Sequence, residues 1–329
     1  MHNWTKWLRK ISESMRKAFK WLKINLFSGN VRIVPKLSLY FILIIFSLIY
    51  IEPILYMVSM SFKSFSDLSD PTAKWIPKDG TLINFKFAIS QLKIIPRFTS
   101  DKTFWQTISS SPMILSIITA IPTAFIQMFT CAFVGYGFGK LKVPCKRFLI
   151  VLLIFAYIVP PQVTFIPTAW VFKNFRLINT PLAFIVPALF ANGIKSSLFI
   201  LIYMQFFRKI PNELEEAALI DGAGYLKIFR RVMFPLAKPA KITVFLFSLV
   251  WHWNETYLTS VLYPSLNTMS TVIATVKEGT DYTYFAGNSY NFLQVKMASC
   301  LLLIAPILIV YIFTQKHFTE SIERTGIVE

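Results

Sequence analysis

The chain has 329 residues, of which 55% are hydrophobic, 16% aromatic and only 15% charged. This composition is too apolar for a water-soluble domain with one core, so it indicates an integral membrane protein. The formal net charge of +18 does not predict nucleic-acid binding, because no soluble nucleic-acid-binding domain is visible. Anionic phospholipid of the inner leaflet is the expected partner of most of the basic residues.

The N-terminal segment 1–36 is basic and amphipathic. Lys and Arg fill much of a helical wheel on which the apolar residues recur at helical spacing, namely Trp4, Trp7, Leu8, Ile11, Met15, Phe19 and Leu22. We predict a cytoplasmic tail whose helix lies in the headgroup plane. The alternative is a disordered positive tail that only enforces topology. The apolar run that follows is too long and too far from the N-terminus for a cleaved signal peptide, so we expect it to be retained.

Six segments are apolar enough to be transmembrane helices, each of which needs roughly 20 mostly apolar residues. They are 37–60, 111–135, 148–171, 181–206, 240–262 and 298–315. The last is short for a full crossing, and we expect it to begin earlier, near Phe292. The sequence therefore predicts an all-α polytopic membrane protein with about six transmembrane helices.

The distribution of Lys and Arg predicts the orientation, because cytoplasmic loops are enriched in them. Most of these residues fall in 1–36, 139–147, 208–241 and 316–329. Both termini should therefore face the cytoplasm, with 316–329 as a second cytoplasmic tail. The loop 61–110 lies on the opposite side and is the predicted small external subdomain.

The sequence contains no recognisable catalytic, metal or nucleotide motif. Ligand-like spacing is absent among the cysteines and histidines, which are Cys131, Cys145, Cys300, His2, His252 and His317. The stretch "GYGFGKLKVPCKR" from Gly135 is not a phosphate-binding loop, because Leu141 follows Lys140 where Ser or Thr is required. We therefore predict no ATPase site and no enzymatic activity in this chain. The small residues are better interpreted as a place where helices pack closely.

The predicted cytoplasmic loop 207–239 contains a helix, a sharp bend and a second helix. Pro211 and the acidic residues after it favour a helix start. Gly222 and Gly224 should end that helix, and Pro235 should turn the chain back into the membrane after a second short helix.

The first of these helices has the properties of a docking element. Ala217, Ala218, Leu219 and Ile220 form a compact apolar surface, and Glu216 and Asp221 can meet cations of a partner. A helix–glycine–helix loop that serves only as a connector is the alternative.

The stretch "EAALIDGAGYLKIFRRVMFP" resembles the signature of permease subunits of binding-protein-dependent ABC importers. Glu216, Ala217 and Ala218 match its Glu-Ala-Ala, and Gly222 follows at the right distance. The family prefers Ile, Leu and Pro nine residues further on, where this chain has Val232, Phe234 and Pro235.

Further stretches are similar to the carbohydrate-uptake permeases, specifically to the second maltose-type permease subunit. They are "WIPKDGTLINF", "VPPQVTFIPTAWVF", "RLINTPLAFIVP", "IPNELEEAALIDGAG" and "WNETYL", and they cover about residues 75–315. The long tail and the long loop 61–110 depart from the shorter members, which leaves the roles of both segments open.

This resemblance implies a type I ABC importer permease core at 111–315 in a bacterial inner membrane. The implied partners are a second permease subunit, two ATP-binding cassette subunits and an external solute-binding protein. ATP and Mg would be bound by the cassettes, and this chain would hold no cofactor. The implied cassette-coupling residues are Glu216, Ala217, Ala218, Asp221, Gly222 and Pro235.

Polar residues and broken helices inside spans tend to line solute pathways. Pro160 and Pro161 interrupt the third span, and Asn192, Gly193 and Lys195 interrupt the fourth. The pathway candidates are Gln162, Asn192, Trp253, Asn254 and Glu255. The alternative is that these residues only pack helices, and the maltose-type resemblance implies that the other permease holds most of the sugar.

The external loop 263–289 resembles the segment by which such permeases reach the binding protein, although flexibility alone would explain its composition. The sequence indicates the solute less clearly than it indicates the family. Basic residues such as Lys173, Arg176 and Lys195 suggest an acidic oligosaccharide, but basic residues at span ends are also ordinary anchors. A permease for a non-sugar solute is the second interpretation, and a membrane-bound enzyme or independent channel is the third.

Overall fold

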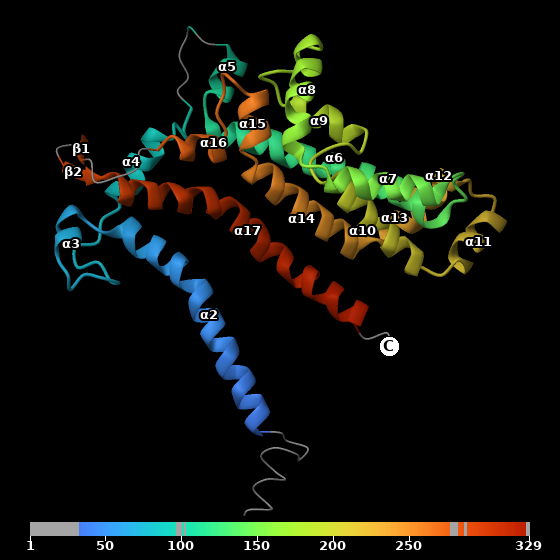
Figure 1. The fold of residues 1–329 in the computed structure, drawn as a ribbon, viewed down its shortest axis with the longest axis horizontal. Helices are drawn as coiled ribbons and strands as arrows, with labels where there is room; N and C mark the ends of the chain where they lie inside the picture. Colours follow the sequence, from blue (N-terminus) through green and yellow to red (C-terminus); the bar gives the residue numbers. More distant parts are fainter. Residues whose placement is uncertain (1–32, 97–100, 102, 277–281, 286–287, 327–329) are drawn as a thin grey trace, which may run out of the picture.

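The computed structural model describes residues 33–96, 101, 103–276, 282–285 and 288–326. The amphipathic helix predicted within 1–36 lies outside these residues. The described chain is helical, as predicted, apart from one short antiparallel hairpin that pairs Tyr282 with Asn291 and Phe285 with Asn288 (Figure 1). Helix α16, strand β1 and the start of strand β2 lie within the segment predicted as the external loop 263–289.

Along the chain, the helices and strands are α2 (Ile33–Phe62), α3 (Phe65–Ser69), α4 (Ile83–Gln91), α5 (Phe104–Ser109), α6 (Pro112–Lys140), α7 (Lys146–Ile158), α8 (Pro161–Asn174), α9 (Leu182–Leu189), α10 (Ser196–Lys209), α11 (Glu213–Ile220), α12 (Tyr225–Ile228), the π-helix η2 (Phe229–Met233), α13 (Phe234–Leu236), α14 (Lys238–Asn254), α15 (Tyr257–Leu262), α16 (Met269–Ala274), β1 (Tyr282–Phe285), β2 (Asn288–Asn291) and α17 (Phe292–Gly326).

Three described helices are long and apolar enough to cross a membrane, in α2, α6 and α17. Two bent pairs qualify if each is taken as one span: α7 with α8, bent by 94°, and α12–α13 with α14, bent by 81°. The predicted span 181–206 is not one helix, because α9 ends at Leu189 and α10 begins at Ser196. The predicted interruptions of the third and fourth spans are therefore confirmed. The last helix begins at Phe292, as expected.

Helix α6 lies at the centre of the bundle and packs against α9, α10 and α14 (Figure 1). Its close approach to α10 depends on glycine. A methyl group at Gly135 would overlap the Tyr203 Cβ and lie 3.1 Å from the Ile200 carbonyl oxygen, and one at Gly139 would lie 3.0 Å from the Phe207 Cβ. The prediction that small residues near the end of this span allow close packing is confirmed.

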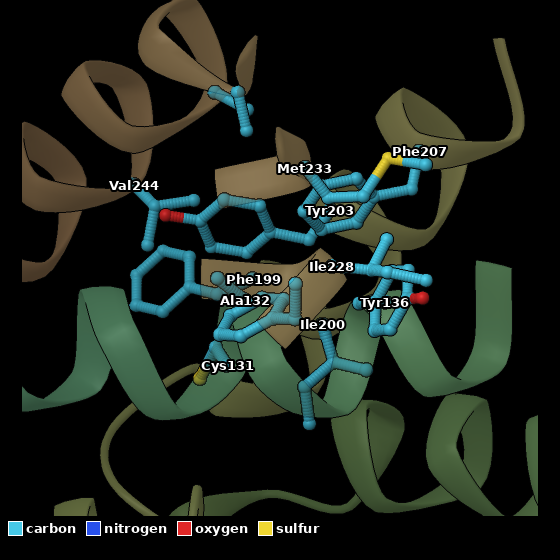
Figure 2. Packing of buried hydrophobic residues seen from close by; sticks show 13 residues of the cluster. Cys131, Ala132, Tyr136, Phe199, Ile200, Tyr203, Phe207, Ile228, Met233 and Val244 are labelled. Carbon is cyan, nitrogen blue, oxygen red and sulfur yellow. The ribbon is translucent and has the colours of Figure 1, made fainter. Parts of the chain in front are cut away.

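The largest buried apolar cluster joins α6 and α10 to the bent segment that follows α11. Figure 2 shows Tyr136 of α6, Tyr203 and Phe207 of α10, and Ile228 and Met233 of the bent segment together in this cluster. All of them are nearly or fully buried. The position of the segment after α11 is thus set by contacts with the two central helices.

The opposite end of the molecule is formed by the segment after α2, α4, the hairpin and the start of α17 (Figure 1). The Gln294 side chain of α17 donates to the carbonyl oxygens of Lys63 and Ser64, at 2.7 and 2.9 Å, and Asn84 of α4 donates to those of Ser61 and Lys63. The loop 61–110 therefore contains helices, of which α4 packs against the last span.

The C-terminal end of α2 packs against α17, whereas the N-terminal part of α2 points away from the bundle (Figure 1). No residue in the most apolar 18-residue stretch of α2 is buried by the rest of the chain. An apolar surface of this extent must be covered by lipid or by another subunit.

Candidate functional site

Helix α11 forms as its sequence predicts. Asn212 precedes it, and Glu213, Glu215 and Glu216 occupy its first turn, where their charges complement the helix dipole. The helix ends in a Schellman motif, in which the Ala223 N–H bonds to the Ala218 carbonyl and the Gly222 N–H to the Leu219 carbonyl, both at 3.0 Å. Gly222 has a φ of +74°, which only glycine adopts without cost.

One face of α11 is fixed to the end of α6. The Tyr136 hydroxyl donates to the buried Glu215 carboxylate at 2.7 Å. The Lys140 ammonium donates to the Ile210 carbonyl and, at 2.6 Å, to the Asn212 side chain. Two side chains of α6 thus bond to the first turn of α11 and to the residues just before it.

The other face of α11 is exposed. Of the predicted docking residues, Glu216, Ala217, Asp221 and Gly222 are exposed, whereas Ala218 packs against the large apolar cluster. Apolar side chains lie open beside them: Leu214, Leu219, Ile220, Tyr225 and Leu226, with Ile220 86% exposed. This exposed surface combines apolar and acidic side chains. It would fit a partner surface that has an apolar groove and basic residues.

Beyond α11 the chain turns back along α14. Pro235 is exposed in α13, and the 81° bend falls at Ala237, two residues after the proline that was predicted to cause it. The predicted second helix, 225–233, is present as α12 and η2.

The structure contains an apolar groove that was not predicted from the sequence. It has a volume of about 440 Å³ and runs between the last turns of α6 and the start of α12. Its lining includes Phe133, Phe138, Leu141, Tyr225 and Leu226.

The five pathway candidates have different environments in the structure. Gln162 lies exposed in the first turn of α8, Asn192 lies exposed in the break between α9 and α10, and Asn254 is exposed at the end of α14. Glu255 accepts a hydrogen bond from the Leu258 N–H at 2.9 Å and so caps α15. Trp253 is 3% exposed and donates to the Leu303 carbonyl at 3.0 Å, which places it between α14 and α17.

A buried polar network at the break between α9 and α10 was missed by the sequence interpretation. Gln127 of α6 donates to the Ile194 carbonyl at 2.8 Å and to the Ser196 hydroxyl at 2.6 Å. It accepts from the Ser248 hydroxyl of α14 at 2.5 Å. The signal that could have revealed it is the recurrence of Thr119, Thr123 and Gln127 every four residues on one face of an apolar helix.

Tyr136→Phe should destabilise the chain, because it leaves the buried Glu215 carboxylate without its hydroxyl donor. The expected loss is about 1–3 kcal/mol of unfolding free energy. It would be measured as a lower thermal midpoint in detergent, with the exposed Tyr225→Phe as the matched control. Equal midpoints for the two variants would show that the bond to Glu215 does not hold α11.

Comparison with known proteins gives one family and several relatives. Residues 132–324 match the family described as "Binding-protein-dependent transport system inner membrane component". The polygalacturonan/rhamnogalacturonan transport system permease protein YtcP of Bacillus subtilis is 28% identical over 292 residues, which cover 86% of this chain and 94% of the relative. The glucose import system permease protein GlcU of Saccharolobus solfataricus is 28% identical over 306 residues, covering 90% and 97%.

A solved structure has the same fold. It is a bacterial ABC transporter involved in the import of the acidic polysaccharide alginate, with a TM-score of 0.66 and 23% identity. The alignment covers 88% of this chain and 98% of that one.

Proposed function

The chain belongs to the family of binding-protein-dependent transport system inner membrane components, and we propose that it is one of two permease subunits of an ATP-driven carbohydrate importer. It is a membrane transport subunit and not an enzyme. In this proposal it forms half of the translocation pathway, and its conformation is driven by nucleotide-hydrolysing subunits encoded elsewhere.

The anchored helix α11 carries this proposal. It is bound to the end of α6 through Glu215 and Tyr136, and its opposite face is exposed, apolar and acidic. A partner that closes and opens can shift a conformational equilibrium only through contacts that differ between the two states. An exposed surface joined to a spanning helix by a buried bond could make such contacts.

The docking residues on the exposed side are Glu216, Ala217, Asp221 and the bend at Gly222. Ala218 and Pro235 take a supporting role, Ala218 in the core beneath the helix and Pro235 in the segment that leads to α14. The cassette would contribute cations for the two carboxylates and a groove for Leu219 and Ile220. ATP and Mg would be bound there and not on this chain.

The proposed assembly spans the bacterial inner membrane. It contains this chain, a second permease subunit, two cassettes and an external solute-binding protein, with α11 and both termini on the cytoplasmic side. The unburied apolar surface of α2 supports a second permease or lipid as the neighbour of that helix. The end formed by α3, α4 and the hairpin would then face the binding protein.

The solute pathway of this half would include Gln162, Asn192 and Asn254, which are exposed near helix ends and breaks. Trp253 and Glu255 are more weakly supported, because one lies between helices and the other caps α15.

We propose an acidic oligosaccharide as the solute. The relative from Bacillus subtilis is named for polygalacturonan and rhamnogalacturonan, both of which contain uronic acid. The basic residues near the expected outer side, Lys173 and Arg176, are consistent with an anionic solute. A neutral sugar is the second candidate, since another relative of equal identity is named for glucose import. A non-sugar solute remains the alternative outside this class.

The test is ATP hydrolysis by the assembled transporter in liposomes, stimulated by its binding protein with one of a panel of oligosaccharides. Trigalacturonate is expected to stimulate hydrolysis and uptake several-fold more than maltotriose or a dipeptide. Equal stimulation by acidic and neutral saccharides would remove the acidic-solute proposal. Hydrolysis that responds to none of the saccharides would remove the carbohydrate assignment.

A further inference from the structure

Two interruptions of spanning helices lie side by side in this fold. The first is the 94° bend between α7 and α8 at Val159 and Pro160. The second is the break between α9 and α10 at 190–195. They meet where the Lys195 ammonium lies 4.9 Å from the centroid of the Tyr157 ring.

The meeting point lies beside the middle of the candidate spanning helix α6. Gln127, whose amide holds the Ile194 carbonyl and the Ser196 hydroxyl, lies about 22 Å from the start of α6 and about 20 Å from its end, at 1.5 Å per residue. Lys195 stands between the two residues that Gln127 holds. It is therefore a lysine at mid-depth and not an anchor at the end of a span.

Three features make a lysine unfavourable at position 195. An ammonium ion is costly at the centre of a bilayer. Lys195 immediately precedes α10, at the end of the helix where the dipole repels a cation. Its φ of +59° is uncommon for a residue with a side chain. Within the part of the chain that the structure describes, its ammonium contacts the Tyr157 ring and forms no ion pair.

The surroundings of Lys195 are open on one side. The inner side of the break is closed by the bonds among Gln127, Ser196 and Ser248. Away from these bonds Asn192 is exposed, Tyr157 is 40% exposed and Lys195 is half-buried. Irregular backbone at membrane depth is tolerated only against protein or a water-filled cavity, so this open side cannot face lipid.

We propose that Lys195 is a specificity-determining residue of the translocation pathway and binds the carboxylate of a uronate unit. A carboxylate placed there would meet the ammonium and the positive end of α10. The exposed ring of Tyr157 would pack against the pyranose, and the Asn192 amide would bond its hydroxyls. This inference rests on the proposed function, because it assigns the recognition of an acidic saccharide to one side chain.

The experiment uses the complete transporter in liposomes with trigalacturonate and with its methyl ester, which has nearly the same shape without the charges. Lys195→Met is expected to lower the uptake of trigalacturonate roughly tenfold or more, because it removes one charge-assisted bond. It should leave the uptake of the ester and the unstimulated ATP hydrolysis near their original values. Lys195→Arg should retain most of the trigalacturonate uptake. Lys86→Met, which removes an exposed lysine of α4, is the matched control.

The outcomes separate this inference from the proposed function. If the unsubstituted transporter prefers trigalacturonate and Lys195→Met keeps that preference, the role of Lys195 is refuted and the acidic solute stands. If Lys195→Met lowers the uptake of acid and ester equally, Lys195 holds the helix break together and recognises nothing. If the unsubstituted transporter prefers the ester, the acidic solute is refuted, and the role of Lys195 with it.

Discussion

Gly135→Ala is expected to prevent stable packing of α6 on α10, whereas Gly137→Ala, two residues along the same helix, is expected to be tolerated. A methyl group at Gly135 would overlap the Tyr203 Cβ and lie 3.1 Å from both the Ile200 carbonyl oxygen and the Met204 nitrogen. These atoms belong to the backbone or are attached directly to it, so no side-chain rotation can relieve the overlap. The strain of such overpacking costs about 3 kcal/mol.

Gly137→Ala provides the matched control, because nothing lies within 4 Å of a methyl group there. Exchanging glycine for alanine in a helix stabilises it by up to about 1 kcal/mol, so both variants gain equally in propensity and differ only in the overlap. The thermal midpoint in detergent and the uptake of solute would be measured for both. A Gly135→Ala protein as stable as the Gly137→Ala protein would refute the close approach of α6 and α10.

Glu216→Lys and Gly222→Val are expected to leave the subunit inserted but to abolish the coupling of transport to ATP hydrolysis. Glu216→Lys reverses an exposed charge that makes no hydrogen bond in the described structure, so it should cost the fold little. Gly222→Val forces a β-branched residue into left-handed backbone, which costs at least about 1–2 kcal/mol and deforms the end of α11. Recovery of the cassette subunit by pull-down, and solute uptake, would both fall sharply.

Gly224→Ala is the control for the bend. Gly224 has a φ of −69°, and a methyl group would meet nothing within 4 Å either there or at Gly222. The two positions therefore differ in backbone conformation and not in space. Undiminished cassette recovery with normal uptake by both Gly222→Val and Glu216→Lys would remove the docking role of α11.

Local patterns in the sequence were sufficient for the fold class and for the coupling segment. Long apolar runs predicted the helical membrane protein, and the helix start before Glu213 and its end at Gly222 appear in the structure where they were expected. Such features depend on interactions within about one helical turn, so residue type and spacing are enough to predict them. The span count, the orientation and the roles of the proposed site residues stay predictions.

Only the tertiary structure decided which neighbouring residues do different work. Glu215 and Glu216 are adjacent residues of the same type. The Glu215 carboxylate is hydrogen-bonded to Tyr136, 79 residues away in the chain, whereas Glu216 is exposed. Likewise Gly135 and Gly137 lie on the same helix, but only Gly135 is in close contact with residues of α10. The mid-depth position of Lys195 depends on Gln127, which lies on another helix. The sequence by itself determined that the chain enters the membrane and where it bends locally, because these features follow from composition and from neighbouring residues. The burial of the Glu215 carboxylate and the exposure of the Glu216 carboxylate depend on contacts between distant segments, which no local pattern contains.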